Sequence, residues 1–281
     1  MATVKQLLTD GETALAGSDS GRLDAEVLLA CSLNRNRTWL YTWPEHIPTL
    51  HEQHLYLELL RRRQDGQPVA YLTGRREFWG LLLKITHDVL IPRPETELLI
   101  ETLLERMVDR NDAIIADLGT GSGAIALALA SEKPDWKFVA TDASDKALAV
   151  AKENAERLEL GNIDFRQGAS GEWTTPLAGM LFDAIVSNPP YVEEKDIHLE
   201  QGDVLFEPIE ALVSGPQGLD DIKKITSQTG PFLHPGGWLM VEHGYNQGEA
   251  VRSIFTDSGF TEVETLRDLA GQERVTVGRR R

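Results

Sequence analysis

The chain has 281 residues, 41% of them hydrophobic and 26% charged, and its formal net charge is −16 at pH 7. Such a composition is ordinary for a globular protein, and the length allows two domains. The acidic balance disfavours direct binding to nucleic acid, because nucleic-acid binders neutralise phosphates with clustered lysine and arginine. With Cys31 as the only cysteine, neither an intramolecular disulfide nor a cysteine-based zinc cluster is expected, and we predict no metal site.

No apolar run approaches the roughly 20 residues that cross a bilayer, and the N-terminus lacks the apolar stretch of a signal peptide. We therefore expect a cytoplasmic protein with no membrane partner. Residues 1–75 carry apolar side chains at helical spacing and show no strand-like alternation. This spacing predicts a small helical bundle domain. The apolar residues that form the pattern are Val4, Leu7, Leu8, Ala25, Leu28, Leu29, Leu55, Leu59 and Leu60.

Residues 76–91 change character, with aromatic and β-branched residues around Gly80. They predict a short β-hairpin that joins the helical domain to the remaining chain, residues 92–281. There, strand-like apolar runs alternate with longer helical patterns, which is typical of an open, mostly parallel α/β sheet. We expect strands at 113–118, 137–142, 163–166, 182–187, 238–242 and 275–278, and helices at 95–108, 124–130 and 145–160.

The turn after the first of these strands is rich in glycine. Gly119, Gly121 and Gly123 allow a sharp turn and let the backbone approach a ligand without an intervening Cβ. The spacing Gly-x-Gly-x-Gly differs from the Gly-x-Gly-x-x-Gly of dinucleotide sites. Asp117 precedes the turn, and Asp142 ends the next strand, where a carboxylate can accept hydrogen bonds from two ribose hydroxyls. A glycine-rich structural turn without a ligand is the alternative.

This pattern resembles the cofactor motif of class I (Rossmann-like) methyltransferases, which use S-adenosylmethionine. The resemblance implies that Asp142 holds the ribose of the cofactor. It further implies that the methionine and ribose are wrapped by Gly119, Thr120, Gly121, Ser122 and Gly123.

The most specific motif follows the strand at 182–187 and reads Asn188-Pro189-Pro190-Tyr191. Two consecutive prolines fix two φ angles and remove two backbone donors. We expect the Asn188 side-chain oxygen and the Pro189 carbonyl to accept hydrogen bonds from an NH₂ group. The nitrogen lone pair is then freed for in-line attack on a methyl group, and Tyr191 packs on the planar substrate with no general base required. A proline-rich loop with a buried tyrosine is the structural alternative.

Enzymes that methylate amino groups conjugated to a π-system share this motif, and their substrates include adenine in DNA, guanine in RNA and glutamine in proteins. The motif therefore specifies the reaction better than the substrate. A DNA or RNA amino-methyltransferase is one alternative, although the acidic composition does not support it. A non-catalytic S-adenosylmethionine-binding factor is another, and it would not need the acceptor geometry of Asn188.

A longer resemblance separates these alternatives. In order along the chain it rests on Leu90-Ile-Pro-Arg-Pro-Glu-Thr-Glu97, Asp117–Ala126, Asn188–Tyr191, Phe206-Glu-Pro208 and Glu242-His-Gly244. Together these segments resemble the protein-(glutamine-N5) methyltransferases known as HemK or PrmC, over nearly the whole chain. The resemblance implies methylation of the Gly-Gly-Gln glutamine of peptide chain release factors 1 and 2. Binding of that glutamine is implied for Asn188, Pro189, Pro190 and Tyr191, and Asn188 is also implied to contact the cofactor.

The resemblance also implies that Trp173 covers the adenine of the cofactor. Here the chain departs from the family pattern, because Glu172 stands where an aspartate is usual and the loop 168–173 is longer. A tryptophan that covers apolar surface is the alternative.

Several polar residues have two interpretations. Arg93, Glu95 and Glu97 belong either to a capped helix start or to a helix that lines the cofactor pocket. His243 is expected to be a polar loop residue and not a base. The long segment 192–219 is expected to help hold the substrate loop, while residues 1–75 recognise the body of the release factor.

Overall fold

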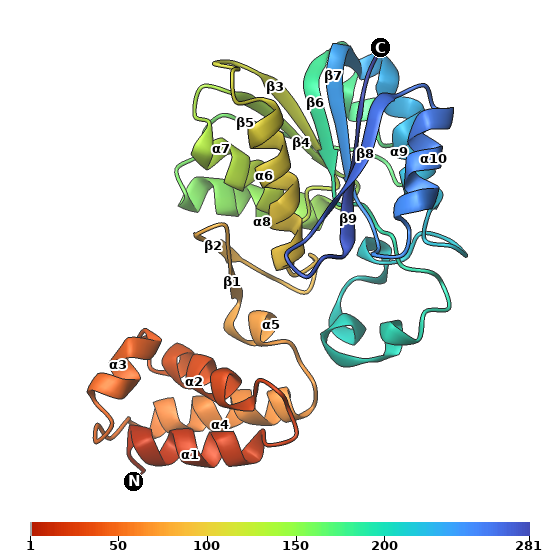
Figure 1. Cartoon of the computed structure of the whole chain (residues 1–281). Coiled ribbons are helices and arrows are strands. Elements are labelled where there is room, and N and C mark those ends of the chain that lie inside the picture. The colour runs from red at the N-terminus through yellow and green to blue at the C-terminus, as the bar shows by residue number, and fades with distance from the viewer. Residues whose placement is uncertain (1) are drawn as a thin grey trace. The chain divides into compact units, whose positions relative to one another are not determined.

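The structure is a computed structural model that describes residues 2–281 and divides into two compact units (Figure 1). The smaller unit comprises the chain up to Arg75 together with the distant segment Glu200–Phe206. The larger unit comprises Arg76–Leu199 and Glu207–Arg281. Two short stretches of the long connection around residue 200 therefore cross from one unit to the other.

The smaller unit is helical, as the apolar spacing predicts. Its helices are α1 (Val4–Ala14), α2 (Gly21–Ser32), α3 (Arg37–Thr42), α4 (Leu50–Gln64) and α5 (Val69–Thr73). Thr3 and Thr49 begin α1 and α4 with capping boxes, in which side chains satisfy backbone N–H groups that a helix start leaves unpaired. Leu28, Leu29 and Tyr56 are fully buried between these helices and form part of the core.

The segment Glu200–Phe206 is held in this unit by charge and by packing. Asp203 accepts a hydrogen bond from Arg63 at 3.0 Å, and the same guanidinium donates to the buried Asp24 at 2.8 Å. The ring of Phe206 lies against Gly66. The long connection after the Asn-Pro-Pro-Tyr motif is thus attached to the helical unit and is not a free loop.

The larger unit begins with the expected hairpin, formed by β1 (Arg75–Phe78) and β2 (Leu81–Lys84) around Gly80. Asn154 ties this hairpin to the rest of the unit. Its side chain accepts from the Lys84 N–H at 2.6 Å and donates to the carbonyls of Lys84 at 3.0 Å and Ser122 at 2.9 Å. The hairpin is therefore linked through one buried side chain to the glycine-rich turn.

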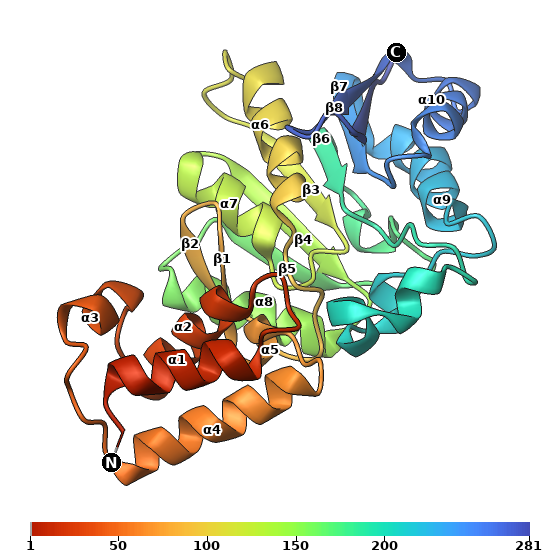
Figure 2. The ribbon, with the colours of Figure 1, turned by 60° about the horizontal axis from the view of Figure 1, so that its bottom comes forward.

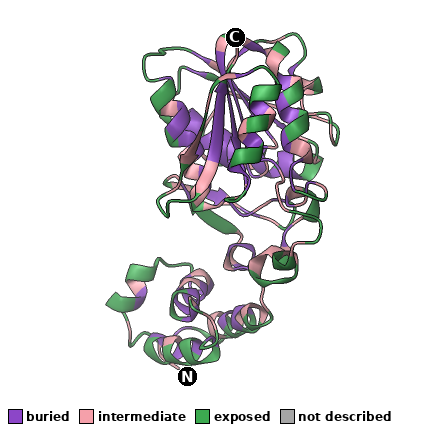
Figure 3. Cartoon of the chain, turned by 45° about the vertical axis from the view of Figure 1, so that its right-hand side comes forward, coloured by how far each residue is buried: buried purple, intermediate pink, exposed green. Residues whose placement is uncertain are grey.

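A seven-stranded sheet, of order β5-β4-β3-β6-β7-β9-β8, forms the centre of this unit. The first five strands of that order are parallel, and the last two pair antiparallel with their neighbours. The strands are β3 (Ile114–Leu118), β4 (Lys137–Asp142), β5 (Ile163–Gln167), β6 (Phe182–Ser187), β7 (Leu233–Glu242), β8 (Thr261–Arg267) and β9 (Glu273–Arg279). Figure 3 shows that the central strands are buried, whereas the outer side of the covering helices is exposed.

Helices cover both faces of the sheet (Figures 1 and 2). One face carries α6 (Glu97–Arg106), α7 (Ala124–Glu132) and α8 (Asp145–Arg157), and the other carries α9 (Asp220–Thr229) and α10 (Gly248–Asp257). This is the expected mostly parallel α/β sheet, with a parallel core that is buried on both faces. Within residues 2–281, no helix is long and apolar enough to cross a membrane.

Helices α9 and α10 and strand β8 have no counterpart in the sequence prediction, and several element boundaries differ from it. The helix expected from residue 95 begins at Glu97, because Pro94–Thr96 form a 3-10 turn before it. Strand β7 begins at Leu233 and includes a His-Pro-Gly-Gly stretch that reads as a turn in sequence. Strand β8 was not predicted; it is an edge strand with half-exposed residues, so its apolar signal is weak.

Candidate active site

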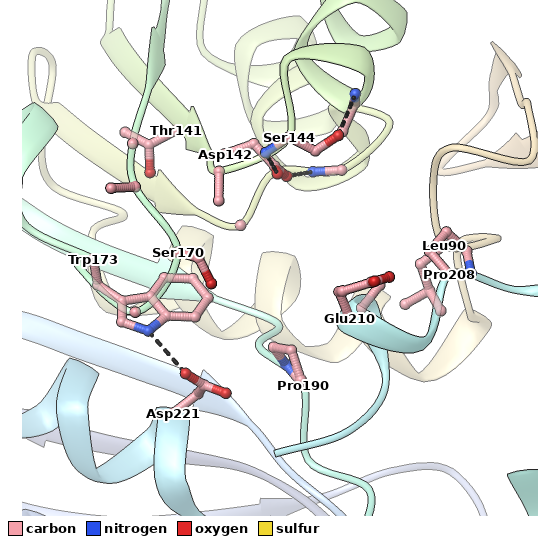
Figure 4. A pocket seen from close by; sticks show the side chains of 18 of the residues that line it. Leu90, Thr141, Asp142, Ser144, Ser170, Trp173, Pro190, Pro208, Glu210 and Asp221 are labelled. Carbon is pink, nitrogen blue, oxygen red and sulfur yellow. Dashed lines mark hydrogen bonds between the residues drawn. The ribbon is translucent and has the colours of Figure 1, made fainter. Parts of the chain in front are cut away.

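A cavity of about 320 Å³ lies at the carboxyl ends of β3, β4, β5 and β6, within the larger unit (Figure 4). Its volume falls in the range of about 300–1,000 Å³ that is usual for small-molecule sites. Ligands of open α/β sheets bind at this end of the strands. The lining includes Leu90, Gly119, Gly121, Thr141, Asp142, Ser144, Ala169, Ser170, Trp173, Asn188, Pro190, Pro208, Glu210 and Asp221.

The glycine-rich turn contributes bare backbone to this cavity. Gly119 and Gly121 have φ values of +73° and +56°, a region in which glycine is strongly favoured over other residues. A Cβ at Gly121 would meet no protein atom within 4 Å, so it would project into open space beside the cavity. Gly123 is different: a Cβ there would lie 2.8 Å from Leu127, so this glycine allows close packing of the turn on α7.

Asp142 ends β4 and lies on the cavity wall. Its Oδ2 accepts from the Gly121 N–H at 2.8 Å, and its Oδ1 accepts from the Ser144 N–H at 2.9 Å. Burial raises the pKa of this carboxyl, and the backbone hydrogen bonds oppose that rise. Each oxygen retains acceptor capacity beyond these bonds, so the carboxylate can also accept hydrogen bonds from a ligand.

Asp117 does not line the cavity but supports the turn from beneath. Its Oδ2 accepts from the Thr120 hydroxyl at 2.6 Å and from the Ala126 N–H at 3.3 Å, whereas Oδ1 is buried and has no partner among the described residues. Burial raises the pKa of Asp117 to about 7. Thr120 and Ser122 are likewise buried and lie outside the lining.

Trp173 forms part of the cavity wall despite the longer loop before it. Its indole Nε1 donates to Oδ1 of Asp221, at the start of α9, over 3.2 Å (Figure 4). The other oxygen of Asp221 accepts from the Ser214 hydroxyl at 2.8 Å. A Cβ at Gly119 would lie 3.1 Å from the indole, so the ring reaches the glycine turn.

The Asn-Pro-Pro-Tyr motif follows β6 and is divided between cavity and interior. Asn188 and Pro190 line the cavity, whereas Pro189 and Tyr191 do not. The Asn188 Nδ2 donates to the Thr96 hydroxyl at 3.1 Å, while its Oδ1 is buried without a partner among the described residues. The Tyr191 hydroxyl donates to Glu242 Oε1 at 3.2 Å, and its ring packs against the core.

Arg93, Glu95 and Glu97, around the start of α6, lie outside the cavity lining, and two of them have structural partners. Arg93 forms an ion pair with the buried Glu207, which also accepts from the Ile91 N–H at 3.1 Å. Glu97 accepts a hydrogen bond from the Trp79 N–H at 3.1 Å. These contacts favour a structural role for Arg93 and Glu97.

His243 is fully buried, with its Nε2 2.8 Å from the Thr276 hydroxyl and its Nδ1 2.9 Å from the Gly244 carbonyl. Burial lowers the pKa of His243. His243 thus lies in the loop directly after β7, as expected, and its imidazole is buried outside the cavity.

Several lining residues were not anticipated from the sequence. Pro208 and Glu210 come from the long connection, Asp221 from the start of α9, and Ser144 from the turn after β4. Pro208 stands in the Phe-Glu-Pro segment, so that motif was an available signal. No sequence signal pointed to Asp221, because only the fold brings the start of α9 to this cavity.

The residues present fit an adenosyl-type cofactor better than a metal ion. Within the described residues, no cluster of three or more His, Cys, Asp or Glu could hold a metal. The turn at Gly119 and Gly121 admits close backbone approach, and Asp142 offers acceptors for hydroxyl groups. The unpaired Asn188 Oδ1 lies beside the same cavity and offers a further acceptor.

Comparisons with known proteins match nearly the whole chain. The PrmC N-terminal domain family matches residues 6–74, and the methyltransferase small domain family matches residues 94–215. A release factor glutamine methyltransferase of Vibrio cholerae is 50% identical over 267 residues, covering 94% of this chain and 91% of the relative. One of Salmonella typhimurium is 47% identical and covers 97% of each chain, and so does one of Escherichia coli at 47% identity.

Solved structures with a similar fold are more distant in sequence. The catalytic domain of hMettl16, in complex with an MAT2A 3′UTR hairpin, is 18% identical with a TM-score of 0.57 and covers 82% of this chain and 80% of that one. A methyltransferase from Pyrococcus furiosus is 18% identical with a TM-score of 0.55 and covers 78% and 96%. At this identity the likeness establishes the methyltransferase fold and nothing about the substrate.

Proposed function

The chain belongs to the family of release factor glutamine methyltransferases, and from this premise we propose its reaction. The enzyme transfers a methyl group from S-adenosylmethionine to the side-chain amide nitrogen, N5, of the glutamine in the Gly-Gly-Gln motif of peptide chain release factors 1 and 2. The observation that carries this proposal is the buried Asn188 Oδ1, which has no partner among the described residues and lies beside the cavity.

The cavity holds the cofactor through the glycine turn and the end of β4. Gly119 and Gly121 admit the methionine and ribose portion against bare backbone, and Asp142 accepts hydrogen bonds from the ribose hydroxyls. Trp173, whose ring reaches the glycine turn at Gly119, covers the adenine. Asp117, Thr120, Ser122 and Gly123 act indirectly, because they hold the turn in shape from below. When bound, S-adenosylmethionine supplies a methyl group on a positively charged sulfur.

The Asn-Pro-Pro-Tyr loop prepares the substrate nitrogen. Asn188 Oδ1 and the Pro189 carbonyl accept hydrogen bonds from the glutamine NH₂, which draws its lone pair out of conjugation with the amide carbonyl. Pro190 and the Tyr191 ring bound the planar amide, and the hydrogen bond of Tyr191 to Glu242 sets the orientation of that ring. Holding two reactants in line can contribute about 7–11 kcal/mol to lowering the barrier.

The division of labour between the units is also part of the proposal. Residues 1–75 recognise the body of the release factor, residues 76–91 are a linker, and residues 92–281 carry out the transfer. Because Glu200–Phe206 belongs to the helical unit, the connection that follows the catalytic loop also contributes to recognition. The protein acts on release factors in the cytoplasm and makes no direct contact with nucleic acid.

Mass spectrometry of a release factor tests this function. The full chain is incubated with S-adenosylmethionine and the purified release factor, and the Gly-Gly-Gln peptide is analysed after proteolysis. We expect a mass gain of one methyl group on the glutamine, and no gain when that glutamine is replaced by alanine. Transfer to DNA or RNA, with an unmodified release factor, would contradict the proposed substrate.

A further inference from the structure

The side-chain amide of Asn188 can be turned in two ways that have nearly the same shape. One orientation presents its oxygen to the substrate, and the other presents its NH₂ group. Only the oxygen can accept a hydrogen bond from the glutamine NH₂, because two donors facing one another do not bind. The reaction therefore requires something that selects one orientation of the amide.

Glu242 is the fixed end of a short relay that makes this selection. It ends β7 and is 1% exposed, and its Oε1 accepts from the Tyr191 hydroxyl at 3.2 Å. A hydrogen bond with the Thr96 side chain opposes the rise in its pKa that burial causes. In its ionised form, which predominates above about pH 7, the carboxylate can only accept, so both hydroxyls direct their protons toward it. The direction of the relay is therefore set at Glu242.

Thr96 passes this direction on to Asn188. Its side chain is 3% exposed, in the 3-10 turn before α6, and its single hydroxyl proton is directed to Glu242. The oxygen is then left as an acceptor, and the Asn188 Nδ2 donates to it at 3.1 Å. The Asn188 Oδ1 consequently occupies the other side of the amide, where it is buried and has no partner in the described chain.

We propose that Thr96 and Glu242 are positioning residues, which hold the Asn188 amide with its oxygen toward the substrate nitrogen. The inference rests on the proposed function, since it concerns the acceptor that this function assigns to Asn188. The three side chains come from segments that are 92 and 54 residues apart in the chain, at the start of α6, after β6 and at the end of β7. Folding of the larger unit brings them together.

A matched pair of variants at Thr96 tests the relay. Thr96→Val keeps the shape of the side chain but removes the hydroxyl, whereas Thr96→Ser keeps the hydroxyl. At pH 8, where Glu242 is mostly ionised, we expect Thr96→Val to lower kcat for release factor methylation by at least about 10-fold, equivalent to about 1.4 kcal/mol. Thr96→Ser should stay within about threefold of the natural chain. The affinity for S-adenosylmethionine, measured by calorimetry, should remain unchanged in both.

A spectroscopic measurement tests the orientation without any turnover. In protein labelled with ¹⁵N-asparagine, the Asn188 NH₂ signals are identified by their loss in Asn188→Ala. We expect these hydrogens to exchange slowly with solvent in the natural chain and in Thr96→Ser, and at least 10-fold faster in Thr96→Val, which lacks the acceptor. Should Thr96→Val not fold, Thr96→Ala removes the same hydroxyl and replaces it in both measurements.

The outcomes separate the two proposals. An unchanged kcat and unchanged NH₂ exchange in the valine variant would overturn the relay while leaving the function intact. Equal losses in the valine and serine variants would also overturn it, because shape and not the hydroxyl would then matter. If the natural chain does not methylate release factors, the proposed function fails, and the exchange measurement still decides whether Thr96 orients the amide.

Discussion

Two buried carboxylates, Asp117 and Glu242, stand at the carboxyl ends of β3 and β7 and organise the two halves of the candidate site. Burial raises the pKa of each to about 7. Asp117 takes its hydrogen bonds from residues three and nine positions further along the chain. Glu242 takes its own from Thr96 and Tyr191, which lie far away in sequence.

This difference between local and long-range hydrogen bonds shows how each half of the candidate site is built. Asp117 holds the glycine turn through local contacts at the start of α7, where the helix N-terminus favours a negative charge. Glu242 holds the Asn-Pro-Pro-Tyr loop through two hydroxyls that reach it only in the folded unit. Under the proposed function, the first network serves cofactor binding and the second serves alignment of the substrate nitrogen. Substitutions in the two networks should then affect different measurements.

The largest expected effect is that of Asn188→Ala, which removes the acceptor at the end of the Glu242 network. Loss of one preorganised group that acts in the transition state typically lowers kcat by about 100- to 1,000-fold. We expect a loss of that size in release factor methylation, with cofactor affinity by calorimetry changed by less than about threefold. An equal loss of cofactor affinity would show that Asn188 belongs to the cofactor half of the site.

The next effect concerns stability and pH. The pKa of Glu242 is raised from 4.5 to about 7, with Arg274 opposing and Glu95 adding to the rise. The folded state therefore holds this proton more tightly than the unfolded state, and the natural chain loses stability as pH rises from about 4.5 to about 7. Glu242→Gln cannot ionise and escapes this loss.

We expect the free energy of unfolding of Glu242→Gln, relative to the natural chain, to be higher at pH 8 than at pH 5, by up to about 3 kcal/mol. Denaturant unfolding at the two pH values measures it. The amide NH₂ of the variant costs stability equally at both, since Oε2 has no partner in the described chain, so only the change with pH is informative. A constant difference would mean that Glu242 is already ionised at pH 5.

A smaller effect is expected from Asp117→Asn, in the other network. The asparagine oxygen can still accept from Thr120, but its NH₂ group replaces an oxygen that is buried without a partner. An unpaired buried donor costs about 1–3 kcal/mol of stability, and here it destabilises the conformation of the glycine turn. We expect cofactor binding to weaken by about 10-fold, while kcat at saturating cofactor stays within about threefold. The reverse pattern would place Asp117 in the transfer step.

The same contrast explains how much could be predicted from sequence. The bounds of β4 and β6 match the predictions because each strand contains an apolar run of at least three residues and ends in a polar residue. Asp142 and Asn188 could be singled out because each directly follows or ends such a strand. Both residues line the cavity because the carboxyl ends of parallel strands meet at the same edge of the sheet. The positions of the two motifs after predicted strands were enough to indicate this.

Thr96 could not be found in this way. Its segment reads as a helix start, and nothing local distinguishes a hydroxyl that faces a carboxylate 146 residues later from one that faces solvent. The hydrogen bond of the Tyr191 hydroxyl to Glu242 could not be predicted for the same reason, because its partner lies 51 residues further along the chain. Long-range side-chain pairing, unlike strand periodicity, leaves no repeating signal in the chain.

The smallest expected effect is that of Tyr191→Phe, which removes one of the two hydroxyls from Glu242. Loss of this 3.2 Å hydrogen bond should lower the free energy of unfolding by about 1 kcal/mol at pH 8, measured by denaturant titration. It should also raise the pKa of Glu242 further, because that hydroxyl stabilises the ionised form. Since Thr96 still donates to the carboxylate, kcat should fall only about two- to threefold. A loss as large as that of Thr96→Val would mean that the tyrosine, and not the threonine, sets the direction of the Asn188 amide.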